Sequence, residues 1–146
     1  MKRIILLLAV LAACDTPVEP SPDASVEESP SCLAAQMHSD LGWIQDNIFT
    51  PSCTFSGCHA GGNGAGDGLV LVTGSSRANL VNQPSKQDSG MLLVTPGDPA
   101  QSYLLVALGG ASGPKPADGF MPLDSGSLCP DKVMAVQRWI AAGAMP

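Results

Sequence analysis

Seven residues near the middle of the chain constrain its fold more than any others: Cys53-Thr54-Phe55-Ser56-Gly57-Cys58-His59. Two thiols and an imidazole so close together can attach one bound group. The composition agrees with such a group, because only 4% of the residues are aromatic, while 16 are glycine and 13 are proline. A core built from so few large side chains is thin, and a bound group with a broad apolar face would help to fill it.

The order of these residues is the one that covalent haem attachment needs. Two thiols add across the vinyl groups of the porphyrin, and the adjacent imidazole ligates the iron. We therefore assign Cys53 and Cys58 to covalent attachment and His59 as the proximal iron ligand, with its second ring nitrogen donating to a carbonyl. The usual spacer has two residues, whereas this one has four and demands a wider loop. A local Cys53–Cys58 disulfide, and a zinc site that adds Cys129, are the alternatives.

The N-terminus predicts export. Lys2 and Arg3 precede an apolar run over residues 4–11 that is too short to span a bilayer, and small residues follow it. Leu11-Ala12-Ala13-Cys14 resembles the lipobox of bacterial lipoproteins, which implies cleavage before Cys14 and a diacylglycerol on its thiol. Residues 1–13 are then a signal peptide, although an ordinary signal with an incidental cysteine is the alternative. Residues 14–31, rich in Pro, Ser and acids, predict a disordered tether to the membrane.

Charge restricts the partners. The formal net charge is −6, and loss of Lys2 and Arg3 with the signal takes it to −8. Such a chain is not expected to bind nucleic acid by neutralising phosphates. A redox partner that is steered electrostatically should be basic.

The cysteine count depends on the haem assignment. Five cysteines less the lipidated Cys14 leave four. If Cys53 and Cys58 hold a haem, Cys32 and Cys129 remain, and in an oxidising compartment they should form a disulfide. Without haem, four cysteines allow three pairings, and the sequence does not choose among them.

The remaining pattern predicts short helices. Apolar positions favour a helix over residues 31–49 that is capped by Ser31 and ended by Thr50-Pro51. Further helices are expected over residues 75–81, over residues 98–108 with Asp98 as N-cap, and from Cys129 to Gly143. Between them lie a Gly-rich loop over residues 60–68 and a Pro/Gly loop over residues 111–119. The apolar run over residues 69–72 is either strand-like or the wall of a pocket.

A distal iron ligand should come from a loop late in the chain. Met121 lies in a loop before the last helix, and Pro122 stiffens it. Met91 and Met134 lie in apolar runs that we assign to the core. A thioether ligand favours ferrous iron and raises the potential.

From residue 48 to residue 144 the chain resembles the small cytochrome c domains of bacterial cell-envelope proteins. The resemblance rests on elements in the same order: Cys53, Cys58 and His59; Pro96-Gly97-Asp98-Pro99; Ser102-Tyr103-Leu104-Leu105; Met121-Pro122; and Trp139-Ile140-Ala141-Ala142-Gly143-Ala144. It implies an all-α fold over residues 32–146, with three to five short helices and long Gly/Pro-rich loops around one haem c. It also implies that Met121 is the distal ligand.

Ligation by His59 and Met121 leaves no open iron position for a substrate. The expected function is therefore electron transfer in the cell envelope by a lipid-anchored carrier, not an enzyme, facing the periplasm or the exterior. The first alternative is a haem-free envelope lipoprotein that uses the same fold as a binding or structural module. The second is a redox sensor in which Met121 dissociates and a small ligand binds the iron.

Overall fold

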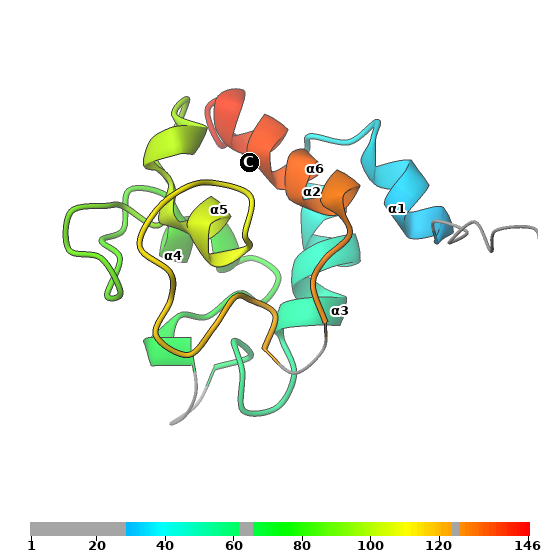
Figure 1. Cartoon of the computed structure of the whole chain (residues 1–146). Helices are drawn as coiled ribbons and strands as arrows, with labels where there is room; N and C mark the ends of the chain where they lie inside the picture. The colour runs from blue at the N-terminus through cyan, green and yellow to red at the C-terminus, as the bar shows by residue number, and fades with distance from the viewer. Residues whose placement is uncertain (1–28, 62–65, 124–125) are drawn as a thin grey trace, which may run out of the picture.

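The computed structural model describes residues 29–61, 66–123 and 126–146 (Figure 1). The expectation of an all-α chain is confirmed: these residues form helices, turns and three isolated β-bridges but no strand. The elements in chain order are α1 (Pro30–Ala35), α2 (Leu41–Ile44), the π-helix η1 (Gln45–Phe49), α3 (Thr50–Cys53), the 3-10 turn η2 (Gly66–Gly68), α4 (Ser76–Leu80), the 3-10 turn η3 (Pro99–Gln101), α5 (Tyr103–Ala107) and α6 (Pro130–Ala141). The predicted signal peptide, Cys14 and all but the last residues of the tether lie outside the described residues.

The single helix expected over residues 31–49 is wrong in two respects. The first helix begins at Pro30, with Ser29 rather than Ser31 as its N-cap, and it ends at Ala35. A new helix then starts because the Asp40 carboxylate accepts a hydrogen bond from the Trp43 N–H at 2.8 Å. The periodic pattern of apolar residues did not indicate this cap. The Asp40 side chain therefore marks where α2 begins, separate from α1.

Pro51 does not end the second helix as the sequence predicted. The elements α2, η1 and α3 follow one another without interruption, so one helical column runs from Leu41 to Cys53 (Figure 1). Pro51 has no N–H to donate to the carbonyl four residues earlier, which belongs to Asn47. Lys132 Nζ donates to that carbonyl instead, at 3.0 Å. The column therefore continues two residues beyond the proline and carries Cys53 at its end.

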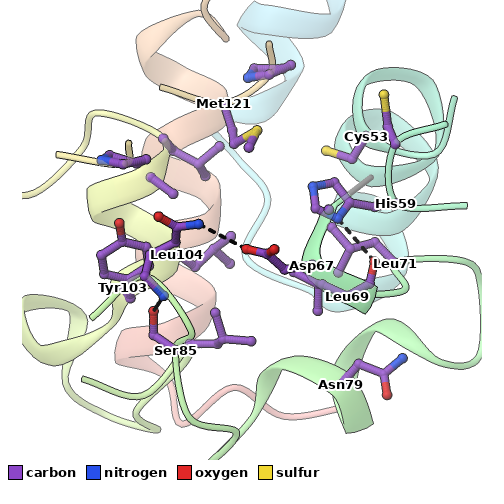
Figure 2. A pocket seen from close by; sticks show the side chains of 18 of the residues that line it. Cys53, His59, Asp67, Leu69, Leu71, Asn79, Ser85, Tyr103, Leu104 and Met121 are labelled. Atoms are coloured by element: carbon purple, nitrogen blue, oxygen red, sulfur yellow. Dashed lines mark hydrogen bonds between the residues drawn. The ribbon is translucent and has the colours of Figure 1, made fainter. Parts of the chain in front are cut away.

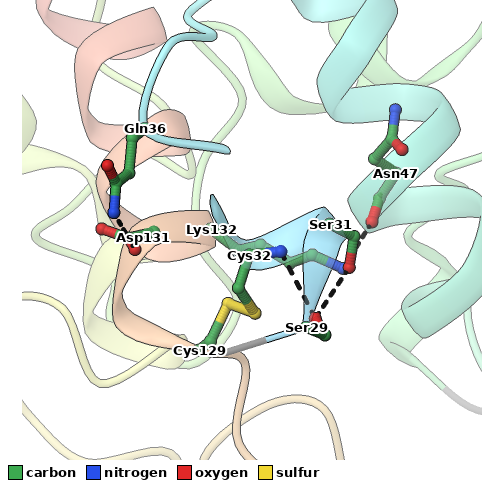
Figure 3. Close-up of a disulfide and its surroundings, with 8 residues drawn as sticks. All are labelled: Ser29, Ser31, Cys32, Gln36, Asn47, Cys129, Asp131 and Lys132. Atoms are coloured by element: carbon green, nitrogen blue, oxygen red, sulfur yellow. Dashed lines mark hydrogen bonds between the residues drawn. A yellow bond between two sulfur atoms is a disulfide. The ribbon is translucent and has the colours of Figure 1, made fainter. Parts of the chain in front are cut away.

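A disulfide and a polar contact hold α1 against α6. Cys32 and Cys129 are bonded across a sequence separation of 97 residues (Figure 3). Nearby, Gln36 Nε2 donates to the Asp131 carboxylate at 2.9 Å. Closing a loop of this length contributes about 4 to 5 kcal/mol on the chain-entropy model. The pair is the one left over once Cys53 and Cys58 are set aside for a cofactor.

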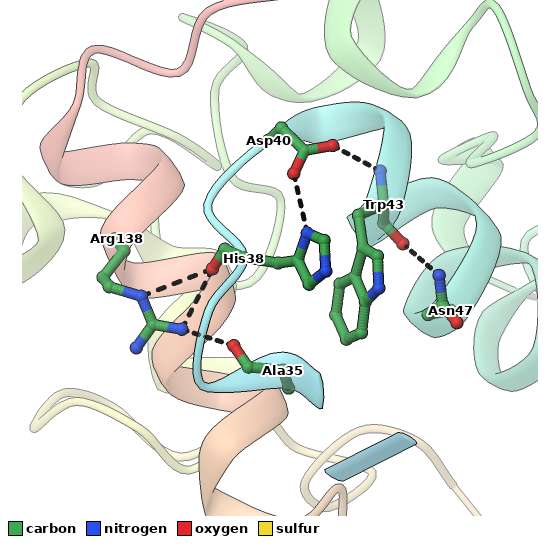
Figure 4. A network of polar contacts seen from close by, with 6 residues as sticks. All are labelled: Ala35, His38, Asp40, Trp43, Asn47 and Arg138. Atoms are coloured by element: carbon green, nitrogen blue, oxygen red, sulfur yellow. Dashed lines mark hydrogen bonds and ion pairs between the residues drawn. The ribbon is translucent and has the colours of Figure 1, made fainter. Parts of the chain in front are cut away.

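Arg138 of α6 binds the C-terminal end of α1. Its guanidinium donates to the carbonyls of Ala35 at 2.5 Å and His38 at 2.9 Å (Figure 4). The His38 ring stacks on Trp43, with 4.6 Å between the ring centroids. A basic side chain placed on the free carbonyls at a helix end satisfies them and complements the helix dipole. These contacts fix the connection between α1 and α2.

The core lies where α6 packs against α1, α2 and α5 (Figure 1). Its largest fully buried side chains are Trp139, Phe49, Ile44, Ile48, Leu80, Leu105 and Ile140. The helices α4 and α6 lie where the sequence predicts them. The helix expected over residues 98–108 is instead divided at Ser102, whose backbone is extended. The N–H groups of Tyr103 and Leu104 donate to the carbonyls of Leu92 and Leu93, which explains the break.

Candidate cofactor site

A cavity of about 620 Å³ brings together the four residues that the sequence assigns to a haem site. Cys53, Cys58, His59 and Met121 all line it (Figure 2). Most of the remaining wall is apolar, formed by Ile48, Phe49, Phe55, Leu69, Leu71, Leu93, Leu104, Ala107, Leu108 and Leu123. A volume between about 300 and 1,000 Å³ with mainly apolar walls is typical of cofactor sites.

The His59 ring is oriented as a metal ligand requires. Its Nδ1 lies 3.1 Å from the Leu69 carbonyl oxygen. A carbonyl can only accept, so in the neutral imidazole Nδ1 carries the ring proton and Nε2 has the free lone pair. Figure 2 shows Nδ1 turned towards this carbonyl while the opposite side of the ring faces the cavity. Such a second hydrogen bond fixes the tautomer and raises the basicity of the ligating nitrogen.

The chain after His59 passes close to its ring. A Cβ atom added to Gly66 would lie 2.4 Å from His59 Nδ1 and 2.6 Å from Cε1, and Gly66 has φ +74°. Only glycine fits this position without displacing the ring. The Leu71 N–H also donates to the His59 carbonyl at 2.8 Å. The run over residues 69–72 is therefore the wall of a pocket and not a strand.

The four-residue spacer is taken up by a turn. The Cys58 N–H donates to the Phe55 carbonyl at 2.9 Å, and the His59 N–H donates to the Cys53 carbonyl at 3.0 Å. Gly57, with φ +86°, supplies the left-handed residue that the turn needs. Of the four spacer residues only Phe55 lines the cavity, and both cysteines still line it.

The two thiols differ in environment. Cys53 is half-buried, and its thiol donates to the Ile48 carbonyl across 3.8 Å. Burial, with a smaller contribution from Cys58, raises the pKa of the Cys53 thiol to about 11. Cys58 is exposed. Both are free thiols among the described residues, so the alternative of a Cys53–Cys58 disulfide does not describe this structure.

Met121 is held at the cavity by its backbone. Its N–H donates to the Ala107 carbonyl, at the end of α5, at 2.7 Å. Figure 2 shows its side chain entering from a different wall than His59 does. Neither Met91 nor Met134 lines the cavity. Met134, expected in the core, is instead 42% exposed on α6.

One part of the cavity was missed at the sequence level. Asp67, Lys86 and Gln87 form a polar rim, and Tyr103 lies beside it. Burial, followed by the charge of Asp88, raises the pKa of the Tyr103 hydroxyl. No local pattern marks these residues, because backbone contacts between distant segments bring them together.

The potential ligands His59 and Met121 suit a metal that is already held by a macrocycle such as a porphyrin. Within the described ranges, no three His, Cys, Asp or Glu side chains are grouped to hold a bare ion. The zinc alternative needed Cys129, which is bonded to Cys32. An iron porphyrin needs only one or two axial ligands from the protein, which the imidazole of His59 and the thioether of Met121 can provide.

No helix among the residues that the structure describes has the length and apolarity to cross a membrane. Comparison of the chain with protein-family models, with curated proteins and with solved structures gave no match.

Proposed function

We propose that this chain is a membrane-anchored monohaem c-type cytochrome that transfers electrons in the cell envelope. One observation carries the proposal: two thiols, an imidazole with a free Nε2 and a thioether line one largely apolar cavity of about 620 Å³. The all-α architecture agrees with the cytochrome c-like fold that the sequence resembles.

Each residue has a distinct role in this proposal. The Cys53 and Cys58 sulfurs would hold the porphyrin by addition across its vinyl groups, and because each thiol hydrogen would pass to the neighbouring carbon, attachment would need no oxidant. His59 would offer its Nε2 lone pair to the iron while its Nδ1 proton stays on the Leu69 carbonyl. Met121 would hold the iron through its thioether sulfur. The haem itself supplies a one-electron iron couple.

The apolar wall would exclude water from this site. In a dry and rigid site, a change in the charge of the iron would reorient few water dipoles. The reorganisation energy is then small, which favours rapid electron transfer. A thioether ligand raises the potential relative to a second imidazole. With both axial positions taken by the protein, the site suits a carrier better than a catalyst.

The N-terminus and the disulfide support a place in the cell envelope. The Cys32–Cys129 bond fits an oxidising compartment such as the periplasm or the exterior. A diacylated Cys14 would hold the domain at a membrane through the tether, where it could meet a basic redox partner. Cys14→Ser should release the protein into the soluble fraction, and continued retention in the membrane fraction would refute the anchor.

Haem attachment is tested by expressing the chain together with the haem-attachment machinery and staining a denaturing gel for haem. We expect the stain to stay with the protein, to persist in Cys32→Ser/Cys129→Ser and to disappear in Cys53→Ala/Cys58→Ala. A colourless protein whose peptide map contains a Cys53–Cys58 bridge would reject the proposal in favour of the haem-free lipoprotein.

A further inference from the structure

The rim of the cavity that faces away from the cysteines has a defined framework. Residues 82–94 fold back on themselves, with the Leu93 N–H donating to the Gln83 carbonyl at 2.7 Å and the Ser85 N–H to the Met91 carbonyl at 3.0 Å. At the tip, the buried Ser85 hydroxyl accepts from the N–H groups of Gln87 at 3.2 Å and Asp88 at 3.1 Å. The backbone that carries Lys86 and Gln87 is therefore fixed.

Two side chains from this tip reach the turn η2. Lys86 Nζ donates to the backbone carbonyl of Asp67, and Gln87 Nε2 donates to the Asp67 carboxylate at 2.9 Å. We call Asp67, Lys86 and Gln87 the polar rim. In Figure 2 Asp67 points across the cavity, and Ser85 lies on the far side from Cys53. The tip that follows Ser85 and carries Lys86 and Gln87 thus lies across the cavity from Cys53, and Asp67 reaches towards it from the wall that holds His59.

The charges of the wall are distributed unevenly. The ionisable residues that line the cavity are Cys53, Cys58, His59, Asp67, Lys86, Tyr103 and Asp118. Lys86 is the only lysine or arginine among the described lining residues. Burying an anion against the apolar wall has a large desolvation cost, so among the described lining residues the Lys86 ammonium is the group that favours negative charge.

We infer that the polar rim, through Lys86 and Gln87, binds the carboxylates of the porphyrin and sets its orientation in the cavity. The inference rests on the proposed function. The two carboxylate side chains of haem lie on the edge opposite its vinyl groups, so attachment at Cys53 and Cys58 directs them towards this rim. Lys86 then exchanges a neutral carbonyl partner for an ionised one, which forms the stronger hydrogen bond. The Asp67 carboxylate repels the porphyrin carboxylates, because it carries the same charge.

The test uses the haem-loaded protein and follows the midpoint potential against pH. Ionisation of a haem carboxylate near the iron produces a bend in this curve at the carboxylate pKa. Lys86→Gln should move the bend to higher pH by roughly half a unit, because an exposed ion pair is weak. Lys86→Arg should restore it, and Asp67→Asn should move it to lower pH. Lys115→Gln is the matched control, since Lys115 lies over the Phe120 ring and outside the cavity wall.

The opposite signs of the Lys86 and Asp67 variants separate a direct contact from a general loss of stability. The inference is overturned if Lys86→Gln and Lys115→Gln give the same profile, or if Lys86→Gln and Asp67→Asn shift it in one direction. Wild-type protein that takes up no covalent haem would overturn the proposed function, and this inference with it. The haem stain thus distinguishes the two failures.

Discussion

The Gly66 backbone lies against the His59 ring so closely that a Cβ atom at residue 66 would come within 2.4 Å of Nδ1. The same turn leads to Leu69, whose carbonyl accepts the Nδ1 proton. Gly66 and Leu69 therefore set the plane and the tautomer of the imidazole.

Gly66→Ala should displace the His59 ring and reduce the fraction of protein that carries correctly ligated haem. The left-handed φ of residue 66 adds a strain of about 1 kcal/mol for any residue with a Cβ. Gly74→Ala is the control, because Gly74 has φ +83° but nothing within 4 Å of its Cβ position. Thermal unfolding should show a similar loss of stability from backbone strain in both variants, whereas the haem spectrum should change only in Gly66→Ala. Matching spectra in the two variants would contradict a positioning role for Gly66.

Met121→Leu tests the distal ligand while keeping the side-chain volume. A volume-conserving substitution should cost less than about 1.5 kcal/mol of stability. The variant should nevertheless lose the thioether-to-iron absorption band, and its reduction potential should fall. Met134→Leu makes the same substitution on α6, away from the cavity, and should leave the absorption band and the reduction potential unchanged. An unaltered absorption band in Met121→Leu would show that Met121 is not the distal iron ligand.

The two thiols of the haem-free chain should react at different rates. A Cys53 pKa of about 11, two units above the ordinary 9.0, leaves roughly a hundredfold less thiolate at neutral pH. Iodoacetamide should therefore alkylate the exposed Cys58 first, and Cys53 only slowly, with a rate that rises as the pH approaches 11. Peptide mass mapping over a time course measures both rates. Equal rates at pH 8 would show that Cys53 is not protected in its position on α3.

Local signals predicted those parts of the fold that depend on neighbouring residues. The sequence Cys129-Pro130-Asp131 places the start of α6 correctly, because a proline at the first helical position acts within one turn. The cysteine motif and Met121 also indicated the site, since their chemistry does not depend on the details of the fold. Their convergence on one cavity could not be derived, because it depends on how α3, α5 and the loops pack.

The errors arose where residues distant in sequence decide the local structure. Pro51 was expected to end a helix. The helix continues, and Lys132, 85 residues after Asn47 in the sequence, donates a hydrogen bond to the Asn47 carbonyl. The helix expected over residues 98–108 breaks because Leu92 and Leu93 compete for the N–H groups of its second turn. The polar rim depends on the turn over residues 82–94, which has no periodic pattern.

Lys132→Met should destabilise the chain by about 1 kcal/mol, because it leaves the Asn47 carbonyl without its donor. Lys115→Met removes a comparable charge beside Phe120 and should have a smaller effect. The informative variant is Pro51→Ala, which restores an N–H that can donate to the Asn47 carbonyl in place of Lys132. In the Pro51→Ala background, Lys132→Met should therefore cost much less than in the wild type.

Urea unfolding of the four proteins in this double-mutant cycle measures the coupling between Pro51 and Lys132. A coupling near zero would mean that solvent satisfies the Asn47 carbonyl and that Lys132 has no part in carrying the helix past the proline. A coupling of about 1 kcal/mol would instead link α6 to the end of α3. The position of Cys53 at the cavity would then depend on a lysine of the last helix, which gives Lys132→Met a second expected effect, a lower yield of covalently attached haem.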